Sequence, residues 1–144
     1  MLFSLGRTEA ERRLLVEKDL GMALRMAKHI NEYNEQRKDI DKQMTEEANQ
    51  IVARLENQKH QSSIVLYDEN WKKGVIGIVA SRLTEIYFRP TVVLTRDGDF
   101  ATGSARSVTG FDVYAAIKSC RDLLVNFGGH TYAAGLTLRW SDIQ

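Results

Sequence analysis

Residues 103–107, with the sequence GSARS, combine small residues with one strong anion ligand. Gly103 lets a backbone come close to a ligand, Ser104 offers a hydroxyl, and Arg106 offers a planar guanidinium that matches two phosphate oxygens. In an extended strand, alternation points Ser104 and Arg106 to the same face. This is the pattern of a phosphate clamp, and a solvated arginine on an edge strand is the alternative.

A second stretch, FGGHTYAAG at residues 127–135, places His130 directly after Gly128 and Gly129. The glycines allow a tight turn whose N–H groups point into a cavity, and a short helical turn through residues 133–134 would offer its N-terminus to an anion. His130 then donates to a phosphate oxygen or shuttles a proton. The alternative is a glycine helix cap followed by a structural or exposed histidine.

A third stretch, WKKGVIGIVASRL, contains two glycines, Gly74 and Gly77, at the start of an expected helix. It matches neither the Walker loop nor the GxGxxG dinucleotide fingerprint, so the glycines favour close packing of helix on sheet. Trp71 is either a core residue or a platform on which a base stacks. Lys72 and Lys73 are further candidates for contact with nucleic-acid phosphates.

No metal site or nucleophilic site can be assembled from the sequence. His29, His60 and His130 are scattered, and neither HExxH nor CxxC occurs. The single cysteine, Cys120, falls on an apolar helical face, where we expect it to pack rather than react.

The composition sets broad limits on the class of protein. The 144 residues suit one compact domain with an extension, and the net charge of +1 leaves any basic site local. One cysteine cannot form an internal disulfide, and the absence of a leader or a long apolar run argues against a secreted or membrane protein. We therefore expect a cytoplasmic protein. The abrupt ends, MLFSLG and RWSDIQ, lead us to expect a piece of a longer protein.

The first part of the chain predicts helix. From Thr8 to about residue 59 there is no proline and one glycine, Gly21. Thr8 and Glu11 have the form of a capping box, and Asp19 is placed to start a second helix of roughly 35–40 residues. That helix carries a narrow, mainly apolar stripe, consisting of Met26, Ile30, Tyr33, Arg37, Ile40, Met44, Ala48, Ile51 and Leu55. A connector that lies against a neighbouring domain is favoured over a coiled-coil arm, because leucine is scarce in the stripe.

The second part of the chain predicts a small mixed α/β domain. A β-α-β unit comprises strands at 64–67 and 91–95 around a helix at 75–87, whose apolar face is Val75, Val79, Leu83 and Ile86. Asp97 and Gly98 predict a hairpin that returns through residues 100–106.

Thr109 and Asp112 resemble another capping box, which precedes a core-facing helix. Its apolar positions are Val113, Ile117, Cys120, Leu124 and Phe127. The glycine pair at 128–129 is expected to end this helix, and Leu136 to Trp140 to form the last strand. We therefore predict a helical connector at residues 1–60 and a domain at 61–144.

Three motifs closely resemble, in order and spacing, the DHH-associated domain of the RecJ family of bacterial single-strand-specific DNA exonucleases. They are NWKKGVIGIVASRL, GSARS with Gly110-Phe111 shortly after, and FGGHTYAAGLTL. The resemblance covers about residues 64–140. The preceding helix is similar to that family's connector.

The resemblance implies that a DHH domain, absent from this sequence, holds Mn²⁺ or Mg²⁺ across a cleft in which single-stranded DNA is degraded from its 5′ end. It also implies roles in DNA repair and recombination. Ser104 and Arg106 are then similar to the residues that grip a phosphate at the 5′ terminus. Gly128, Gly129 and His130 resemble the loop that meets a phosphate near the metals, with His130 assisting catalysis. This chain alone is expected to bind no metal and to be inactive.

Two alternatives remain open. One is a related DHH-type phosphoesterase that acts on oligonucleotides or cyclic dinucleotides, although the long connector and the IGIVASRL segment argue against it. The other is a helical dimerisation module with an attached ligand-binding domain.

Overall fold

The computed structural model describes residues 9, 11–12, 19–58 and 61–143. The chain divides into two compact units, residues 1–40 and 41–144, and this division lies inside the long helix α2, Leu20–Gln58. The expected connector at residues 1–60 and domain at 61–144 stay predictions. At 39 residues, α2 confirms the predicted long helix. Its start is also as predicted, because Asp19 Oδ1 accepts a hydrogen bond of 2.8 Å from the Met22 N–H. The expected capping box at Thr8 lies outside the described residues.

The predicted apolar stripe of α2 is correct only in part. In residues 41–58 the helix buries Asp41, Met44, Ala48 and Val52, at steps of three, four and four. The predicted Leu55 is 38% exposed instead. The buried face is therefore rotated slightly from the predicted one, and it includes Asp41, which pairs with Arg82 at 2.9 Å.

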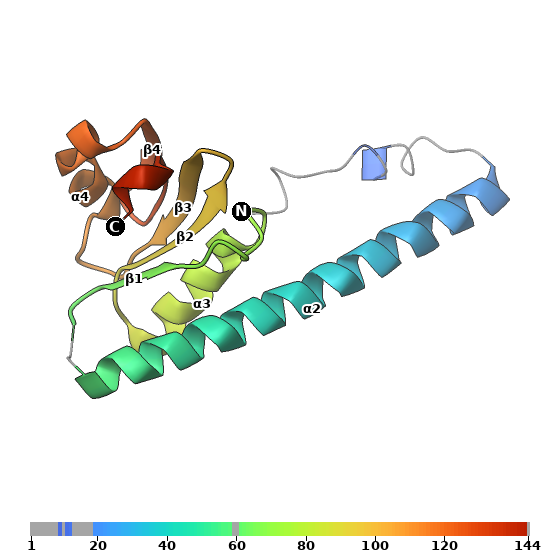
Figure 1. Cartoon of the computed structure of the whole chain (residues 1–144). Helices are drawn as coiled ribbons and strands as arrows, with labels where there is room; N and C mark the ends of the chain where they lie inside the picture. Colours follow the sequence, from blue (N-terminus) through green and yellow to red (C-terminus); the bar gives the residue numbers. More distant parts are fainter. Residues whose placement is uncertain (1–8, 10, 13–18, 59–60, 144) are drawn as a thin grey trace. The chain divides into compact units, whose positions relative to one another are not determined.

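A five-stranded mixed sheet forms the centre of the second unit, which confirms the predicted fold class (Figure 1). The strand order is β1-β2-β3-β5-β4; β1 and β2 are parallel and every other neighbouring pair is antiparallel. The strands are β1 Ile64–Tyr67, β2 Thr91–Asp97, β3 Phe100–Arg106, β4 Asn126–His130 and β5 Ala133–Arg139.

Helix α3, Ile76–Tyr87, joins β1 to β2 and completes the predicted β-α-β unit. Its fully buried positions are Val79, Ala80 and Leu83, whereas the predicted core residue Ile86 is 50% exposed. The helix ends at Phe88, which adopts the left-handed conformation with φ of 55° two residues before the single proline.

The Asp97-Gly98 hairpin is also confirmed. Gly98 has a φ of 64°, and β3 returns antiparallel to β2. Such a tight turn requires positive φ, which glycine adopts without steric cost.

Helix α4, Val113–Ser119, differs from its prediction at both ends. Its N-cap is Asp112, whose carboxylate accepts from the Ala115 N–H at 2.9 Å, so the predicted cap at Thr109 is wrong. After a short 3-10 turn, η2 (Arg121–Leu123), the chain enters β4. Cys120 is exposed, not packed as predicted, because the helix ends before the apolar repeat does.

The FGGHTYAAG stretch is a hairpin of β4 and β5 around residues 131–132. The predictions of a helix stop at Gly128-Gly129 and of a helical turn at 133–134 were therefore wrong. Gly129 has a φ of 137°, and a Cβ on it would lie 2.4 Å from the carbonyl oxygen of Ala133. Glycine pairs are also common at helix ends. Here Gly129 is required because β4 and β5 approach each other closely at this position.

The two sides of the sheet are covered by different helices. Helix α4 packs on β4 and β5, where Val113 and Ile117 form a cluster with Ala105 and Ala134. Helix α3 packs on β2 and β3. Its Gly77 lies against Ser104 and Arg106, which alternate along β3 with Ala105 and so point to the other face. The two helices therefore lie on opposite faces (Figure 1).

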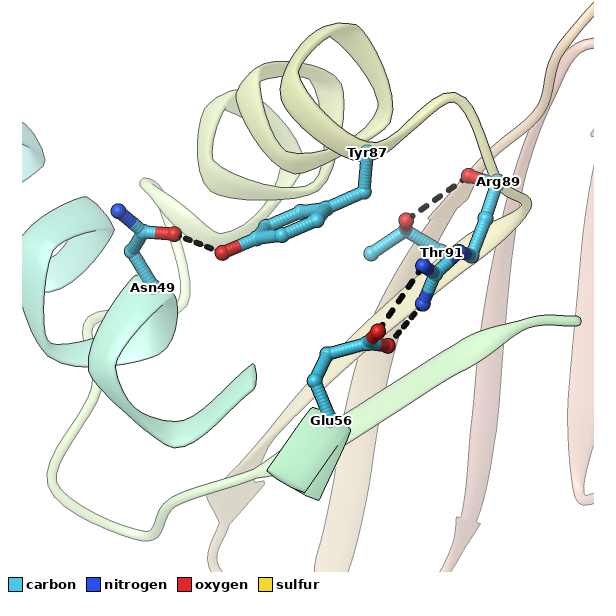
Figure 2. A network of polar contacts seen from close by, with 5 residues as sticks. All are labelled: Asn49, Glu56, Tyr87, Arg89 and Thr91. Atoms are coloured by element: carbon cyan, nitrogen blue, oxygen red, sulfur yellow. Dashed lines mark hydrogen bonds and ion pairs between the residues drawn. The ribbon is translucent and has the colours of Figure 1, made fainter. Parts of the chain in front are cut away.

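The last turns of α2 are joined to the connection between α3 and β2 by polar contacts (Figure 2). The Tyr87 hydroxyl bonds to Asn49, and the Arg89 guanidinium pairs with Glu56. This hydrogen-bonded pairing raises the pKa of Arg89. Residues 41–58 are thus held against the rest of the second unit.

Gly129 provides a stability test with a matched neighbour. Gly129→Ala is expected to lower the free energy of unfolding by about 3 kcal/mol, since the new methyl group meets backbone atoms in a positive-φ conformation. Gly128→Ala is the control: its Cβ has no atom within 4 Å, so its stability should stay close to that of the original chain. Urea denaturation of both variants measures the difference, and equal loss in both would contradict the hairpin geometry.

Candidate functional site

Ser104 and Arg106 lie on the same face of β3, the face on which α3 packs. Strand register pairs Ser104 with Gly135 and Arg106 with Ala133 on β5. Gly103 belongs to the other face: it is buried, and a Cβ there would lie 2.4 Å from the Leu94 side chain. The glycine of GSARS therefore allows packing on the α4 side and does not open the backbone to a ligand beside Arg106.

The first turn of α3 lies directly against this pair. A Cβ on Gly77 would be 3.0 Å from Arg106 Nη2 and 3.4 Å from Ser104 Oγ. A methyl group at this position would require the end of the Arg106 side chain to shift, so the glycine permits the observed close approach. The sequence showed that this glycine serves helix–sheet packing, but not that it borders the Ser104 and Arg106 side chains.

The Arg106 guanidinium is half-buried and carries unused donors. Its Nη1 donates to the Ala105 carbonyl at 2.8 Å, and within the described residues no carboxylate pairs with it. Burial lowers the pKa of Arg106, although an arginine remains protonated at neutral pH. An anion would accept hydrogen bonds from the remaining N–H donors and balance the charge of this half-buried guanidinium.

His130 lies in the same row of the sheet as Arg106. Arg106 pairs with Ala133, and Ala133 pairs with His130, so all three side chains point to one face. Two strand spacings separate Arg106 and His130, which places their Cα atoms about 10 Å apart. His130 is exposed.

The floor between these side chains is made of small residues. In the next row Ser104, Gly135 and Gly128 lie side by side across three strands. Gly128 and Gly135 are exposed, and no heavy atom lies within 4 Å of a Cβ built on Gly128. The result is a shallow surface with a hydroxyl and a cation at one side and an imidazole at the other.

The hairpin tip that carries His130 is fixed by backbone contacts. The Ser107 N–H donates to the Tyr132 carbonyl at 3.0 Å, and the Val113 N–H donates to the Thr131 carbonyl at 3.0 Å. His130 therefore lies on a strand whose hairpin tip is held by backbone hydrogen bonds, and not at a helix N-terminus as expected.

The remaining candidates lie elsewhere. Trp71 is 4% exposed and its Nε1 donates to Glu47 at 3.1 Å, so the core alternative holds and its ring is not free to stack with a base. Lys73 pairs with Asp97 at 2.8 Å. Asp97 is the last residue of β2, whereas Thr91, which pairs with Arg106, is the first. Lys72 is exposed beside it.

The described residues do not form a metal site. Among them no three histidine, cysteine, aspartate or glutamate side chains gather as a ligand set. The Mn²⁺ or Mg²⁺ implied by the resemblance therefore does not fit these residues, and we derive no step through it. In the same part of the chain, none of the helices combines the length and apolarity that crossing a bilayer requires.

The fold and this face define a small mixed α/β domain that gathers a hydroxyl, a guanidinium and an imidazole on one side of β3, β4 and β5. The model of the DHHA1 domain family matches residues 57–144, more than half of the chain. The chain belongs to the DHHA1 family, in agreement with the resemblance drawn from its motifs.

Its relatives among curated proteins are RecJ enzymes. The "Single-stranded-DNA-specific exonuclease RecJ" of Bacillus subtilis is 39% identical over 132 residues, which cover 90% of this chain and 16% of that protein. The protein of the same name from Escherichia coli is 33% identical, with coverage of 87% and 23%. The chain thus spans less than a quarter of the length of these relatives.

Solved structures agree. RecJ of Thermus thermophilus in complex with Mg²⁺ superimposes with a TM-score of 0.78 at 28% identity, over 92% of this chain and 20% of that one. A second structure, exonuclease RecJ bound to manganese, gives a TM-score of 0.77 at 30% identity, over 95% of this chain and 33% of that one.

Inorganic phosphate can test whether the unpaired guanidinium of Arg106 binds an anion. Because the folded chain half-buries an unpaired cation, Arg106→Met is expected to be as stable as the original chain or more so without added anion. The lowered pKa disfavours the protonated guanidinium in the folded state. This cost is constant below that pKa, so the comparison should not vary with pH near neutrality.

Added phosphate should then stabilise the original chain more than the Arg106→Met variant, by about 1.4 kcal/mol at ten times the dissociation constant. Thermal unfolding in phosphate and in chloride of equal ionic strength measures this, with the variant correcting for general salt effects. Equal stabilisation of both proteins would remove Arg106 from the anion site.

Proposed function

We propose that this chain is the substrate-positioning part of a RecJ-type 5′→3′ single-stranded-DNA exonuclease. Its site comprises Ser104, Arg106, Gly128 and His130, with Gly129 holding the hairpin in shape. The observation that carries the proposal is the shared row of Arg106 and His130 on one open face of the sheet.

A nucleic-acid phosphate suits the arrangement better than a carboxylate metabolite. Ser104 and Arg106 offer a hydroxyl and a fork of N–H donors against one group, and the flat glycine floor leaves room for the sugar on either side. The relatives' name, single-stranded-DNA-specific exonuclease, indicates the polymer. The phosphate at the 5′ terminus carries the most charge, and we assign it to Arg106.

His130 has a separate role in this proposal. Its imidazole stands about two strands from Arg106, so it can donate to the next phosphate along a short piece of DNA. There it would orient the phosphate for hydrolysis, and a DHH domain would supply the metal ions for that chemistry. The DHH domain of the same protein is the partner across the cleft, and Mn²⁺ or Mg²⁺ are its cofactors.

Binding to DNA gives the first test. The chain is expected to bind a 5′-phosphorylated single-stranded oligonucleotide weakly and with strong salt dependence, because it contacts few phosphates. Arg106→Ala should weaken binding and reduce the slope of log K against log salt by about 0.7, the value for one phosphate of a single strand. The exposed Arg121 on η2 provides the matched control, since Arg121→Ala removes the same charge away from the site. Fluorescence anisotropy measures both; equal effects would mean that binding is a general charge effect.

Activity gives the second test. In Mn²⁺ or Mg²⁺ the repurified chain is expected to release no nucleotides from single-stranded DNA, because the described residues offer no metal ligand set. Turnover that persists through repurification and is lost in His130→Ala would place the metal chemistry inside this chain and overturn the proposal.

A further inference from the structure

A hollow of about 360 Å³ opens beside the proposed phosphate row. It is lined by Glu85 and Phe88 from the end of α3, by Ser107 and Thr109 after β3, and by Tyr132 from the β4–β5 hairpin. Ser107 directly follows Arg106, and Tyr132 lies between His130 and Ala133. The hollow therefore adjoins the site without using any of its side chains.

The lining of the hollow is aromatic, hydroxylic and acidic. Phe88 and Tyr132 are 77% and 48% exposed, a large apolar surface to leave in water. Neither lysine nor arginine lines the hollow, and Glu85 makes none of the ion pairs found in the described part of the chain. This chemistry repels a phosphate and suits an uncharged planar ring that carries an amino group.

Phe88 is held in place by its neighbours. Its φ of 55° is a conformation that bulky side chains rarely adopt, and its N–H donates to the Thr84 carbonyl at 2.9 Å. Tyr87 and Arg89, on either side, are tied to Asn49 and Glu56 of α2, as Figure 2 shows. Strained backbone that its surroundings hold in place is typical of functional positions. The backbone that carries the exposed ring is thus held in place.

We propose that this hollow receives the base of a nucleotide next to the phosphate bound by Arg106. The base stacks on Phe88 and Tyr132, and the Glu85 carboxylate accepts from the exocyclic amino group of cytosine or adenine. The inference rests on the proposed function, since it assigns a base subsite to the same DNA. It makes the domain a reader of nucleotide units, with preference for amino-bearing bases over thymine.

The variants for the test preserve the backbone. Phe88→Asn removes the ring and keeps a residue that tolerates the left-handed conformation, while Tyr132→Ala removes the second ring. Tyr132→Phe keeps the ring and serves as the conservative control. Each variant is compared with the original chain by anisotropy on a short 5′-phosphorylated oligonucleotide and on the same strand with abasic sites at its first nucleotides.

Phe88→Asn and Tyr132→Ala are each expected to weaken binding of the intact strand by about 5-fold to 100-fold, the range for one lost base stack. The salt slope should not change, because no phosphate contact is lost. Both variants should bind the abasic strand as the original chain does. Tyr132→Phe should retain full affinity, and Glu85→Gln should reduce the preference for oligocytidylate over oligothymidylate.

The base subsite and the phosphate site fail in different ways. If Arg106→Ala weakens binding while both ring variants and the abasic strand bind like their controls, the base subsite is wrong and the proposed function stands. The proposed function is wrong if the original chain binds equally well with and without the 5′-phosphate, or binds neither strand at low salt. The base subsite is then wrong as well.

Discussion

The close approach of α3 to β3 at Gly77 is the constraint on which the site depends. It encloses the Arg106 guanidinium beside Ser104, half out of water, and gives it no carboxylate partner among the described residues. A cation in such surroundings is less stable than one in solvent, and an incoming anion offsets that cost. The glycine permits this close approach, because a methyl group at that position would meet the guanidinium at 3.0 Å and the Ser104 hydroxyl at 3.4 Å.

Strand order then decides what lies next to this cation. Because β5 lies between β3 and β4, the row that begins at Arg106 ends at His130 on the edge strand. Helix α4 covers the other side of these strands, where Ala105 and Ala134 face the core. The alternation of side chains along β3 therefore gives the strand small buried residues on the face toward α4 and polar, partly exposed residues on the other.

Sequence patterns predicted the structure wherever local signals were sufficient. The β-α-β unit, the hairpin at Gly98 and the long helix follow from periodicity, turn residues and caps, all of which act within a few residues. The stretch around Gly128 was misassigned, because a glycine pair suits a helix end as well as closely paired strands, and only its pairing with distant residues decides between them. For the same reason no pattern showed that Gly77 touches Arg106.

The central claim is that Arg106 and His130 belong to one site, in which they contact neighbouring phosphates of the same DNA strand. Side-chain NMR of the chain during titration with a 5′-phosphorylated dinucleotide tests this most directly, because the guanidinium of Arg106 and the imidazole of His130 report separately in one sample. We predict that both signals move with the same dissociation constant, and that this constant rises for the dephosphorylated dinucleotide, which lacks the group assigned to Arg106. Movement of only one signal, or equal movement without the terminal phosphate, would contradict a shared site.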